Sequence, residues 1–504
     1  MTRQRGRAVA RLPVVCALLL AGCHPSRPAA VPATPASLAP NPLVRLQQDF
    51  DAALAAPALE RGTWGVLVRS LSRQDTLYEK NARSLLIPAS NLKVVTLAVA
   101  AQKLGWDYSY ETRILRRGPI EGDVLHGDLI VAGTGDPSLS EEDGSAQRAF
   151  QEWADGLKAL GIRVIAGRIV GDDNAFDDDG YGAGWMWDDM DQAYSAAIGA
   201  LQVNVNAMTL TLTPRSSEGA PAKLALSSDG SGLTVRNQVM TGAAAAPPRI
   251  LTRRLANTRV LEISGTVPVG SPPVARTVAV DNPTLYYASV LRRALIASGL
   301  EVRGEAADID DLADVASPGQ TVPLFSHRSP PLSRLAETLM TISQNQYAET
   351  FLKTLGSGDG PATFEAGRQA VRETLTTWGV PASGIVYADG SGLSRYDLLT
   401  AETLVTVLAH VANDAILNAP FQACLPVAGV AGTLSNRLAG TTAAGLVRAK
   451  TGSMSNVRSI SGYVKTADGE PLIFSIIANN YAVPSADIDR VADALILELA
   501  EFTR

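Results

Sequence analysis

The sequence predicts an α+β protein in which one antiparallel sheet, covered by helices, is built from both ends of the chain and interrupted by a large, mostly β insertion. Strand-like alternation occurs near the start, in "TWGVLVRSL" from residue 63, and near the end, in "VRSISGYVKTADG" from residue 457. Helical spacing dominates between them after residue 325, whereas short runs bounded by Gly, Asp, Thr and Pro fill 106–324. We therefore expect one domain from 43–105 and 325–504, with 106–324 inserted as one or two β-rich domains.

The N-terminus has the layout of a secretory signal. Four arginines precede an apolar run of about twelve residues, which is shorter than the roughly twenty that a membrane-spanning helix needs. These arginines are Arg3, Arg5, Arg7 and Arg11. The run ends in "LAGC", which resembles a bacterial lipobox and implies a lipoprotein signal peptide over 1–22 and a lipid on Cys23. The alternative is a plain signal peptide with an incidental cysteine. The Pro- and Ala-rich stretch 23–42 is expected to be a tether.

Composition argues against several kinds of partner and site. A formal net charge of -6 gives no reason to expect nucleic-acid binding. Of the three cysteines, Cys16 would leave with the signal and Cys23 would carry lipid, so Cys424 would remain alone and no intrachain disulfide is expected. The four histidines show no metal-ligand spacing, and no Gly-x-Ser-x-Gly elbow occurs.

One Ser-x-x-Lys tetrapeptide occurs, in "PASNLK", where Ser90 stands three residues before Lys93. Residues three apart on a helix share a face, so the two side chains can meet. A serine needs a nearby base to act as a nucleophile, and burial together with a second cation would lower the pKa of Lys93 enough to leave its amine neutral. The alternative is structural: Ser90 caps the helix that follows Pro88, and Lys93 faces solvent.

A second cation is available in "AKTGSMSN", on a strand expected at the edge of the sheet. Lys450 would supply that charge. Thr451 and Ser453 lie two apart and could hold a carboxylate with their hydroxyls, and Gly452 would leave room for a peptide to pair along the edge. On its own, a Lys-Thr-Gly sequence is as typical of the point where a strand passes into a turn as it is of a functional site.

A third motif is Ser-Gln-Asn, in which Ser343 could relay a proton and Asn345 could hold a substrate carbonyl. In their order, Ser-x-x-Lys, Ser-x-Asn and Lys-Thr-Gly resemble the motifs of the penicillin-interacting serine acyltransferases and β-lactamases. The 253 residues from Ser90 to Ser343 resemble the class C low-molecular-mass penicillin-binding proteins, the D-alanyl-D-alanine carboxypeptidase and endopeptidase family, which carry a large insertion there. The stretches "HGDLIVAGTGDPSLS", "GDDNAF", "YADGSGLSR" and "LPVAGVAGTLSNR" resemble the same family.

The resemblance implies a penicillin-binding/β-lactamase-like transpeptidase domain and a role for each motif residue. Ser90 would be acylated, and Lys93 would take its proton. Ser343 and Lys450 would assist proton transfer to the leaving D-alanine, while Asn345 orients the peptide. The substrate's terminal carboxylate would bind Thr451 and Ser453 beside Gly452, and the backbone N–H groups of Ser90 and Ser453 would form an oxyanion hole.

The same resemblance implies a pocket for a diaminopimelate side chain, lined by Asp172, Arg395 and Met454. Two departures leave the balance between carboxypeptidase and endopeptidase work open: Gln344 stands where relatives often have Asp, and Asp397 where they often have Asn. The acidic loop "GDDNAFDDD" could instead be a solvated loop or a calcium site, although it lacks the EF-hand spacing.

The function implied is a serine-type D-Ala-D-Ala carboxypeptidase, and also an endopeptidase, that trims peptidoglycan stem peptides and cross-links and is acylated by penicillin and other β-lactam antibiotics. No cofactor and no metal are implied. The expected location is the periplasm, with the chain held to the membrane by lipid on Cys23; His24 after that cysteine favours the outer membrane. A β-lactamase and a catalytically silent wall-binding lipoprotein are the alternatives.

Overall fold

A computed structural model describes residues 41–228, 230–313 and 321–504. The chain divides into two units, 1–41 and 42–504, and the helices and strands below all belong to the second. The signal peptide, the lipid site at Cys23 and nearly all of the predicted tether lie outside the described residues. Pro42, the last residue of that tether, is instead the first residue of helix α1 (Pro42–Leu54). Within the described part, no helix has both the length and the apolar character needed to cross a bilayer.

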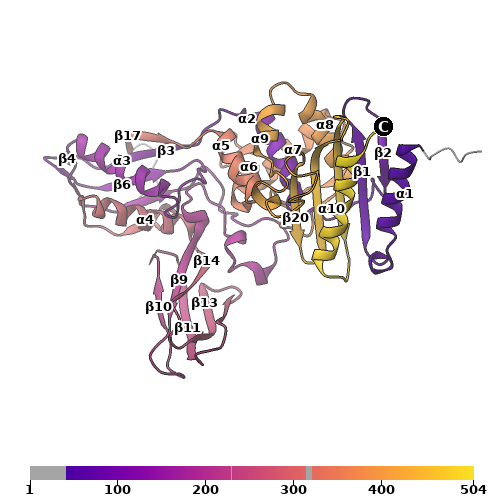
Figure 1. The fold of residues 1–504 in the computed structure, drawn as a ribbon. Coiled ribbons are helices and arrows are strands. Elements are labelled where there is room, and N and C mark those ends of the chain that lie inside the picture. Colours follow the sequence, from indigo (N-terminus) through magenta and orange to yellow (C-terminus); the bar gives the residue numbers. More distant parts are fainter. Residues whose placement is uncertain (1–40, 229, 314–320) are drawn as a thin grey trace, which may run out of the picture. The chain divides into compact units, whose positions relative to one another are not determined.

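The two ends of the chain share a five-stranded antiparallel sheet, as predicted (Figure 1). Its order is β2-β1-β22-β21-β20. The strands are β1 (Thr63–Ser70), β2 (Thr76–Lys80), β20 (Arg448–Met454), β21 (Val457–Lys465) and β22 (Pro471–Asn479). Neighbouring strands pair antiparallel throughout. Because β20 is an edge strand, one side of its backbone has no partner strand.

Helices cover both faces of this sheet, which confirms the predicted fold class. Side chains alternate along a strand, so Val66 and Val68 pack with α1 and α10 (Ser485–Glu501), whereas Leu67 packs with the helices of the other face. Those helices are α2 (Leu92–Leu104), α5 (Leu332–Thr341), α6 (Asn345–Leu355), α7 (Phe364–Thr377), α8 (Ala401–Asn413) and α9 (Asn418–Cys424). A short strand pair, β18 (Ile385–Val386) and β19 (Leu398–Leu399), frames a loop beside them.

Helix α2 is the centre of this helical layer because it is apolar on nearly every side. All residues from Leu92 to Ala101 are buried, in the sequence "LKVVTLAVAA". This run contains the polar side chains Lys93 and Thr96. A buried amine destabilises the fold unless it finds hydrogen-bond partners, so Lys93 must be provided with them.

The residues between the two halves of this sheet form four further sheets (Figure 1). Their orders are β16-β8-β6-β3-β17, β15-β7-β5-β4, β10-β9-β14 and β11-β13-β12. The strands are β3 (Glu111–Arg117), β4 (Ile120–Glu121), β5 (Val124–Leu125), β6 (Asp128–Ala132), β7 (Val164–Ile165), β8 (Ile169–Asp172), β9 (Ala207–Thr213), β10 (Lys223–Leu226), β11 (Thr234–Gly242), β12 (Arg249–Arg254), β13 (Val260–Pro268), β14 (Val274–Ala279), β15 (Glu301–Val302), β16 (Ala306–Asp308) and β17 (Thr321–Arg328). Helices α3 (Ser145–Ala159) and α4 (Pro283–Ala297) pack in the same region.

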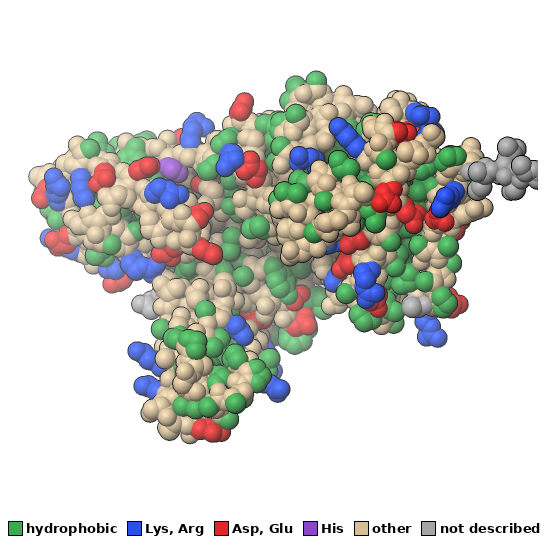
Figure 2. All heavy atoms as spheres, viewed as in Figure 1, with side chains coloured by type: hydrophobic (Ala, Val, Ile, Leu, Met, Phe, Trp, Pro, Cys, Tyr) green, Lys and Arg blue, Asp and Glu red, His purple; other side chains and the backbone are tan. Residues whose placement is uncertain are grey.

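The predicted boundary at residue 325 falls inside a strand. Strand β17 pairs with β3 from Thr321 to Arg328, so the pairing of the inserted region continues past 325. The division into 43–105 with 325–504 and an inserted 106–324 remains our proposal. On the face shown in Figure 2, basic and acidic side chains are interspersed rather than gathered into a large patch of one sign.

Candidate active site

Ser90 lies in a single 3₁₀ turn, η2 (Ala89–Asn91), which leads directly into α2. The preceding residue, Ala89, has a left-handed backbone with φ of 47°, a conformation that costs free energy for a residue with a Cβ. The residue that caps α2 is Asn91, and no side chain makes a capping hydrogen bond there. The prediction that Ser90 caps the helix is therefore wrong, because the extra turn places the cap one residue later.

Strand β21 holds this turn in place through Ser459. Its Oγ donates to the carbonyl of Pro88 (2.5 Å) and accepts from Nδ2 of Asn91 (2.6 Å). Asn91 and Ser459 are buried, so water cannot replace these bonds if either partner is lost. Ser459 was not predicted from the sequence, since no local pattern distinguishes it from the other serines of that strand.

Gly452 allows strand β20 to approach the turn closely. A Cβ at this position would lie 2.6 Å from the carbonyl oxygen of Pro88, 3.0 Å from the backbone nitrogen of Asn91 and 2.2 Å from Oγ of Ser459. The room that we predicted for a substrate peptide is thus taken by the protein's own backbone. The glycine of Lys-Thr-Gly fixes the distance between the strand and Ser90.

Lys93 lies buried beneath Ser90 with three hydrogen-bond partners. Its Nζ is 2.9 Å from Oγ of Ser90, 2.7 Å from Oδ1 of Asn345 and 2.8 Å from the carbonyl oxygen of Ser391. Burial lowers the pKa of Lys93 from 10.5 to about 7, although nearby acidic groups act in the opposite direction. The predicted solvent-facing alternative is excluded, because the side chain is fully buried.

Three buried acidic residues, Glu349, Asp389 and Asp397, hold the loop that contains Ser391. Glu349 accepts from the backbone N–H groups of Gly390 (2.7 Å) and Ser391 (2.8 Å). Asp389 accepts from loop N–H groups through both oxygens, and Oδ1 of Asp397 accepts from two more. All three are fully buried, so the loop's polar backbone is satisfied without water. The carbonyl that contacts Lys93 is thereby fixed.

Burial raises the pKa of two of these acids. The pKa of Glu349 is raised first by desolvation and then by the charge of Asp389. Desolvation also raises the pKa of Asp397 well above its usual value, again with Asp389 adding to the effect. From the sequence, Asp397 was identified only as a residue that differs from the usual Asn of the family, and Glu349 was not identified. Glu349 stands four residues after Asn345 on helix α6, so helical spacing toward the same face could have indicated it.

Lys450 faces Ser343 across the site. Its Nζ donates to Oγ of Ser343 (2.8 Å) and to the carbonyl of Thr451 (2.8 Å). Ser343 has φ of 62°, a strained left-handed conformation, in the turn between α5 and α6. Burial, and then the charge of Lys93, hold the pKa of Lys450 well below its usual value. The structure thus brings together the two lysines and the residues Ser90, Ser343 and Asn345.

The open edge of β20 presents backbone N–H groups next to these side chains. The N–H of Ala449 donates to the carbonyl of Pro426 (3.1 Å), on the side of β20 away from β21. N–H groups alternate between the two sides of a strand, so those of Thr451 and Ser453 also point to the open side. Oγ1 of Thr451 donates to Oγ1 of Thr433 (2.7 Å), while Ser453 is exposed.

The predicted diaminopimelate residues are only partly brought together. Nη2 of Arg395 donates to the carbonyl of Ser455 (3.1 Å), which follows Met454 at the end of β20. Asp172 ends strand β8, and its Oδ1 accepts from the backbone N–H and Nδ2 of Asn174. Among the described residues, no hydrogen bond or ion pair joins Asp172 to Arg395 or Met454.

A segment of the inserted region, residues 183–195, contacts the site instead. Nδ2 of Asn345 donates to the carbonyl of Tyr194 (2.9 Å), and Nε1 of Trp185 donates to Oδ2 of Asp389 (2.9 Å). Oγ of Ser394 donates to the carbonyl of Ala183 (2.6 Å). No sequence pattern predicted a contact between this segment and the site.

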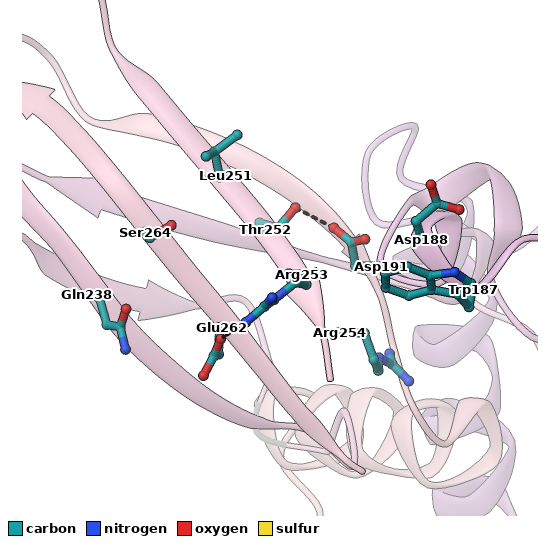
Figure 3. Close-up of a pocket in the computed structure, with 10 residues that line it drawn as sticks. All are labelled: Trp187, Asp188, Asp191, Gln238, Leu251, Thr252, Arg253, Arg254, Glu262 and Ser264. Atoms are coloured by element: carbon teal, nitrogen blue, oxygen red, sulfur yellow. Dashed lines mark hydrogen bonds and ion pairs between the residues drawn. The ribbon is translucent and has the colours of Figure 1, made fainter. Parts of the chain in front are cut away.

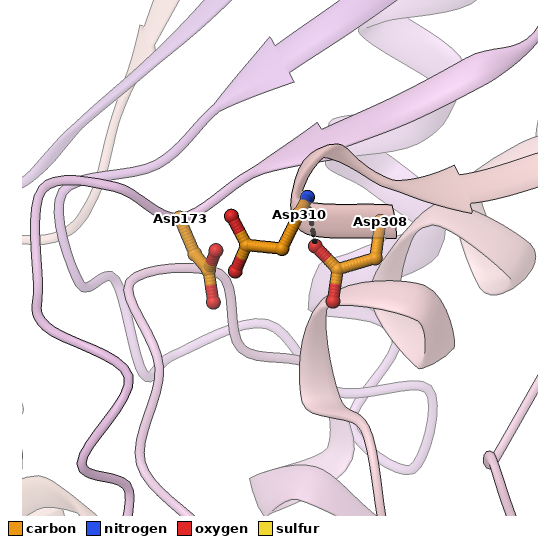
Figure 4. Close-up of side chains that lie close together, drawn as sticks. All are labelled: Asp173, Asp308 and Asp310. Carbon is orange, nitrogen blue, oxygen red and sulfur yellow. Dashed lines mark hydrogen bonds between the residues drawn. The ribbon is translucent and has the colours of Figure 1, made fainter. Parts of the chain in front are cut away.

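One group of carboxylates in the described part of the chain could hold a metal ion: Asp173, Asp308 and Asp310 offer oxygens within 4.8 Å of one another (Figure 4). Protein donors already bind two of them. Asp173 accepts from Thr284, and Asp308 accepts from Asn282 and from the backbone N–H of Asp310. The contacts between Ser90 and its neighbours involve none of these carboxylates.

Comparisons with known proteins agree on one family. The model of the D-Ala-D-Ala carboxypeptidase 3 (S13) family matches residues 46–501. A D-alanyl-D-alanine carboxypeptidase of an Actinomadura species is 36% identical over 479 residues, covering 91% of this chain and 85% of the relative. D-alanyl-D-alanine carboxypeptidase DacB of Haemophilus influenzae is 28% identical, covering 83% of this chain and 85% of its own length.

Solved structures show the same likeness. The crystal structure of penicillin binding protein 4 (dacB) from Haemophilus influenzae superposes with a TM-score of 0.78 at 28% sequence identity, covering 90% of this chain and 99% of that one. The same protein complexed with a novel β-lactam gives a TM-score of 0.73 at 26% identity, over 90% and 99% of the two chains.

The raised pKa of Asp397 predicts how stability depends on pH. An unfolded aspartate loses its proton near pH 4, whereas the folded group keeps it to a much higher pH, so the folded state binds more protons and stability falls as pH rises above about 4. Asp397→Asn keeps the acceptor for the N–H of Ala388 and removes this titration. We expect the free energy of unfolding of the variant to fall less than that of the wild type between pH 5 and pH 8.

The measurement is the free energy of unfolding at pH 5 to 8. Asp414→Asn is the matched control: backbone hydrogen bonds lower the pKa of this carboxyl, so it is ionised throughout that range and the control keeps the wild-type slope. Parallel curves for the wild type and Asp397→Asn would show that Asp397 titrates normally.

Proposed function

The chain belongs to the D-Ala-D-Ala carboxypeptidase 3 (S13) family, which makes it a D-Ala-D-Ala carboxypeptidase of the penicillin-binding kind, and we propose from this premise that it works through an acyl-enzyme on Ser90. The observation that carries the proposal is the buried pair of Lys93 and Ser90, 2.9 Å apart. An amine with a pKa of about 7 is about half neutral at pH 7 and mostly neutral at pH 8, and the neutral form can take the serine proton.

In the first step, Oγ of Ser90 attacks the carbonyl carbon of the D-Ala-D-Ala bond while its proton moves to Nζ of Lys93. The oxygen of that carbonyl gains negative charge and would be held by the N–H groups of Ser90 and Ser453. The N–H direction derived for β20 supports the second donor. Asn345 would orient the substrate through its amide, which already contacts Lys93 and the carbonyl of Tyr194.

In the second step, the C–N bond breaks and the leaving D-alanine amine needs a proton. Ser343 is suited to deliver it, because Nζ of Lys450 donates to its hydroxyl oxygen from 2.8 Å away. The leaving group's carboxylate would lie against the hydroxyls of Thr451 and Ser453, near the amine of Lys450. The proton that Lys93 took from Ser90 passes to Ser343, which restores neutral Lys93 and the Ser343 hydroxyl. A water molecule then attacks the acyl carbonyl carbon while one of its protons moves to Lys93, and that proton passes to Oγ of Ser90 as the ester C–O bond breaks.

The same geometry supports acylation by penicillin, whose strained amide would meet Ser90 in the same position. A relative with 26% identity has been crystallised in complex with a β-lactam. A β-lactamase would use the same first step, and the two functions differ in the rate at which water releases the acyl group.

We also propose that the enzyme acts as an endopeptidase that cleaves peptidoglycan cross-links. The open edge of β20 can accept an extended peptide chain as an added strand. Arg395 lies beside the end of that strand next to Met454, where a diaminopimelate carboxylate could pair with the guanidinium. The side chain of Asp172 accepts hydrogen bonds from Asn174, and among the described residues none joins it to Arg395, so the support for this pocket comes from Arg395 and Met454.

The proposed base predicts the pH dependence of acylation. Only neutral Lys93 can accept a proton, so the acylation rate constant should rise as pH increases through about 7 and then level off. Lys93→Arg should lower the rate by about 100- to 10,000-fold, since a guanidinium stays protonated. The measurement is acylation by a chromogenic β-lactam from pH 5.5 to 9.

Lys103→Arg is the matched control, because Lys103 is an exposed lysine on the same helix, and it should keep the wild-type profile. A rate that is flat from pH 5.5 to 9 would contradict a base with this pKa.

The proposed nucleophile predicts a covalent adduct and a defined product. Labelled penicillin should stay bound to the wild-type protein and to Ser357→Ala, an exposed-serine control, but not to Ser90→Ala. Mass spectrometry of digested muropeptides should show loss of D-alanine, and cleaved cross-links where the endopeptidase proposal holds. Rapid turnover of penicillin would instead indicate a β-lactamase, and an unreactive wild type would support a silent wall-binding protein.

We propose further that the protein is periplasmic and lipid-anchored at Cys23, as "LAGC" indicates; His24 leans toward the outer membrane. Labelling with radioactive palmitate in a Gram-negative host should mark the full chain and the control Cys16→Ser, but not Cys23→Ser. Equal labelling of Cys23→Ser would rule the anchor out, and fractionation of the two membranes would locate the labelled protein.

A further inference from the structure

A pocket lies in the inserted region, between residues 187–191 and the sheet of strands β11, β13 and β12 (Figure 3). Its volume is about 490 Å³, within the range of small-ligand sites. One wall carries Trp187, Asp188 and Asp191, and the other wall consists of strand residues such as Gln238 and Leu251. Neither the acyl-enzyme chemistry nor the diaminopimelate pocket uses these residues.

The lining combines exposed apolar surface with neutral hydrogen-bonding groups. Trp187 is 65% exposed and Leu251 is 71% exposed, so an indole and an isobutyl group are available at the pocket. Gln238, Thr252 and Ser264 add an amide and two hydroxyls. An indole face with polar groups around it suits a ligand that has an apolar face and hydroxyl or amide groups at its edge, as a pyranose ring does.

Most charged side chains of the pocket already have partners, Asp188, which is exposed, being the exception among the described residues, and this disfavours an anionic ligand. Nη2 of Arg253 is 2.8 Å from Oε2 of Glu262, and Nη1 of Arg254 is 2.7 Å from Oδ1 of Asp281. Asp191 accepts from Thr252 and from the side chain of Gln192. An ionic ligand would have to compete with these pairs, whereas a neutral ligand would leave them intact.

One buried donor is left over. Nε of Arg254 is buried and has no hydrogen-bond partner among the described residues. Arg254 as a whole is only 7% exposed, and its other two side-chain nitrogens are hydrogen-bonded. A buried N–H without an acceptor is destabilising until a ligand or water supplies one. Because Nε itself is buried, a neutral carbonyl such as that of an N-acetyl group would bind it only after the Arg254 side chain shifts toward the pocket.

One short segment, residues 187–194, contributes both to the pocket and to the contacts of Asn345. Tyr194, whose carbonyl accepts from Asn345, donates from its hydroxyl to Oδ1 of Asp189 (2.5 Å). Asp189 closes the η3 turn (Trp187–Asp189), which starts at Trp187. A molecule that extends from the active site across this segment therefore reaches the pocket.

We propose that this pocket binds an N-acetylated amino sugar of the peptidoglycan glycan strand, the neutral part of the polymer to which stem peptides are attached. The inference rests on the proposed function, because it assigns a second subsite to the same substrate. Sugar binding there would select stem peptides that are still joined to glycan over free peptides.

The test compares two substrates of the full chain: a stem pentapeptide, and the same peptide carried on its disaccharide. Trp187→Ala and Gln238→Ala, one from each wall, should raise KM for the disaccharide-linked peptide about tenfold, with kcat unchanged. In the wild type, KM for the free peptide should exceed KM for the disaccharide-linked peptide, and in both variants this ratio should fall toward one. Leu226→Ala is the control, an exposed leucine on β10 outside the pocket, and it should change neither KM.

The outcomes separate this inference from the proposed function. Equal KM values for the two substrates in the wild type, or unchanged values in both variants, would overturn the sugar site while leaving the carboxypeptidase intact. A rise in KM for the free peptide as well would assign the pocket to the peptide and also overturn the inference. Failure of both substrates to react in the wild type would instead refute the proposed function. Because Trp187 is largely exposed, unfolding midpoints should stay at the wild-type value and exclude misfolding.

Discussion

The burial of Lys93 against Ser90 is the constraint on which the rest of the site depends. In water the amine would be charged and could not accept a proton, so the fold must remove it from solvent and still give it hydrogen-bond partners. Helix α2 removes the amine from solvent because the helix is apolar on nearly all sides. The hydrogen-bond partners are Ser90, Asn345 and the carbonyl of Ser391. The low pKa of Lys93 is a consequence of where α2 lies in the helical layer.

Two elements from distant parts of the sequence keep this arrangement rigid. The loop that presents Ser391 is held by buried carboxyl groups, among them Glu349, so its carbonyl cannot turn away from the amine. The turn that carries Ser90 is held from the sheet side by Ser459 and by the close approach of β20 at Gly452. The nucleophile therefore lies between an edge strand and a helical layer, at a place where a peptide can enter along the open edge.

The sequence predicted the parts of this site that are local patterns and missed those that depend on packing. The shared antiparallel sheet followed from alternation at both ends, and the meeting of Ser90 with Lys93 followed from helical spacing. The capping role of Ser90 was wrong because an extra 3₁₀ turn precedes α2. The role of Gly452 was wrong because the atoms around it belong to Pro88 and Ser459, which only the folded sheet brings near. Glu349 and Asp172 show the same limit. The folded structure shows that Glu349 is buried and holds the Ser391 loop, whereas no hydrogen bond or ion pair in the described part of the chain joins Asp172 to Arg395 or Met454.

The central claim is that Lys93 is a buried amine of low pKa in the resting protein. Lysine labelled with carbon-13 at Cε reports each amine's titration by NMR, and with 8 lysines in the chain the spectrum of Lys93→Arg identifies the signal that belongs to residue 93. We predict that the signal of Lys93 titrates near pH 7. A pKa close to 10.5, the ordinary value for lysine, would contradict it.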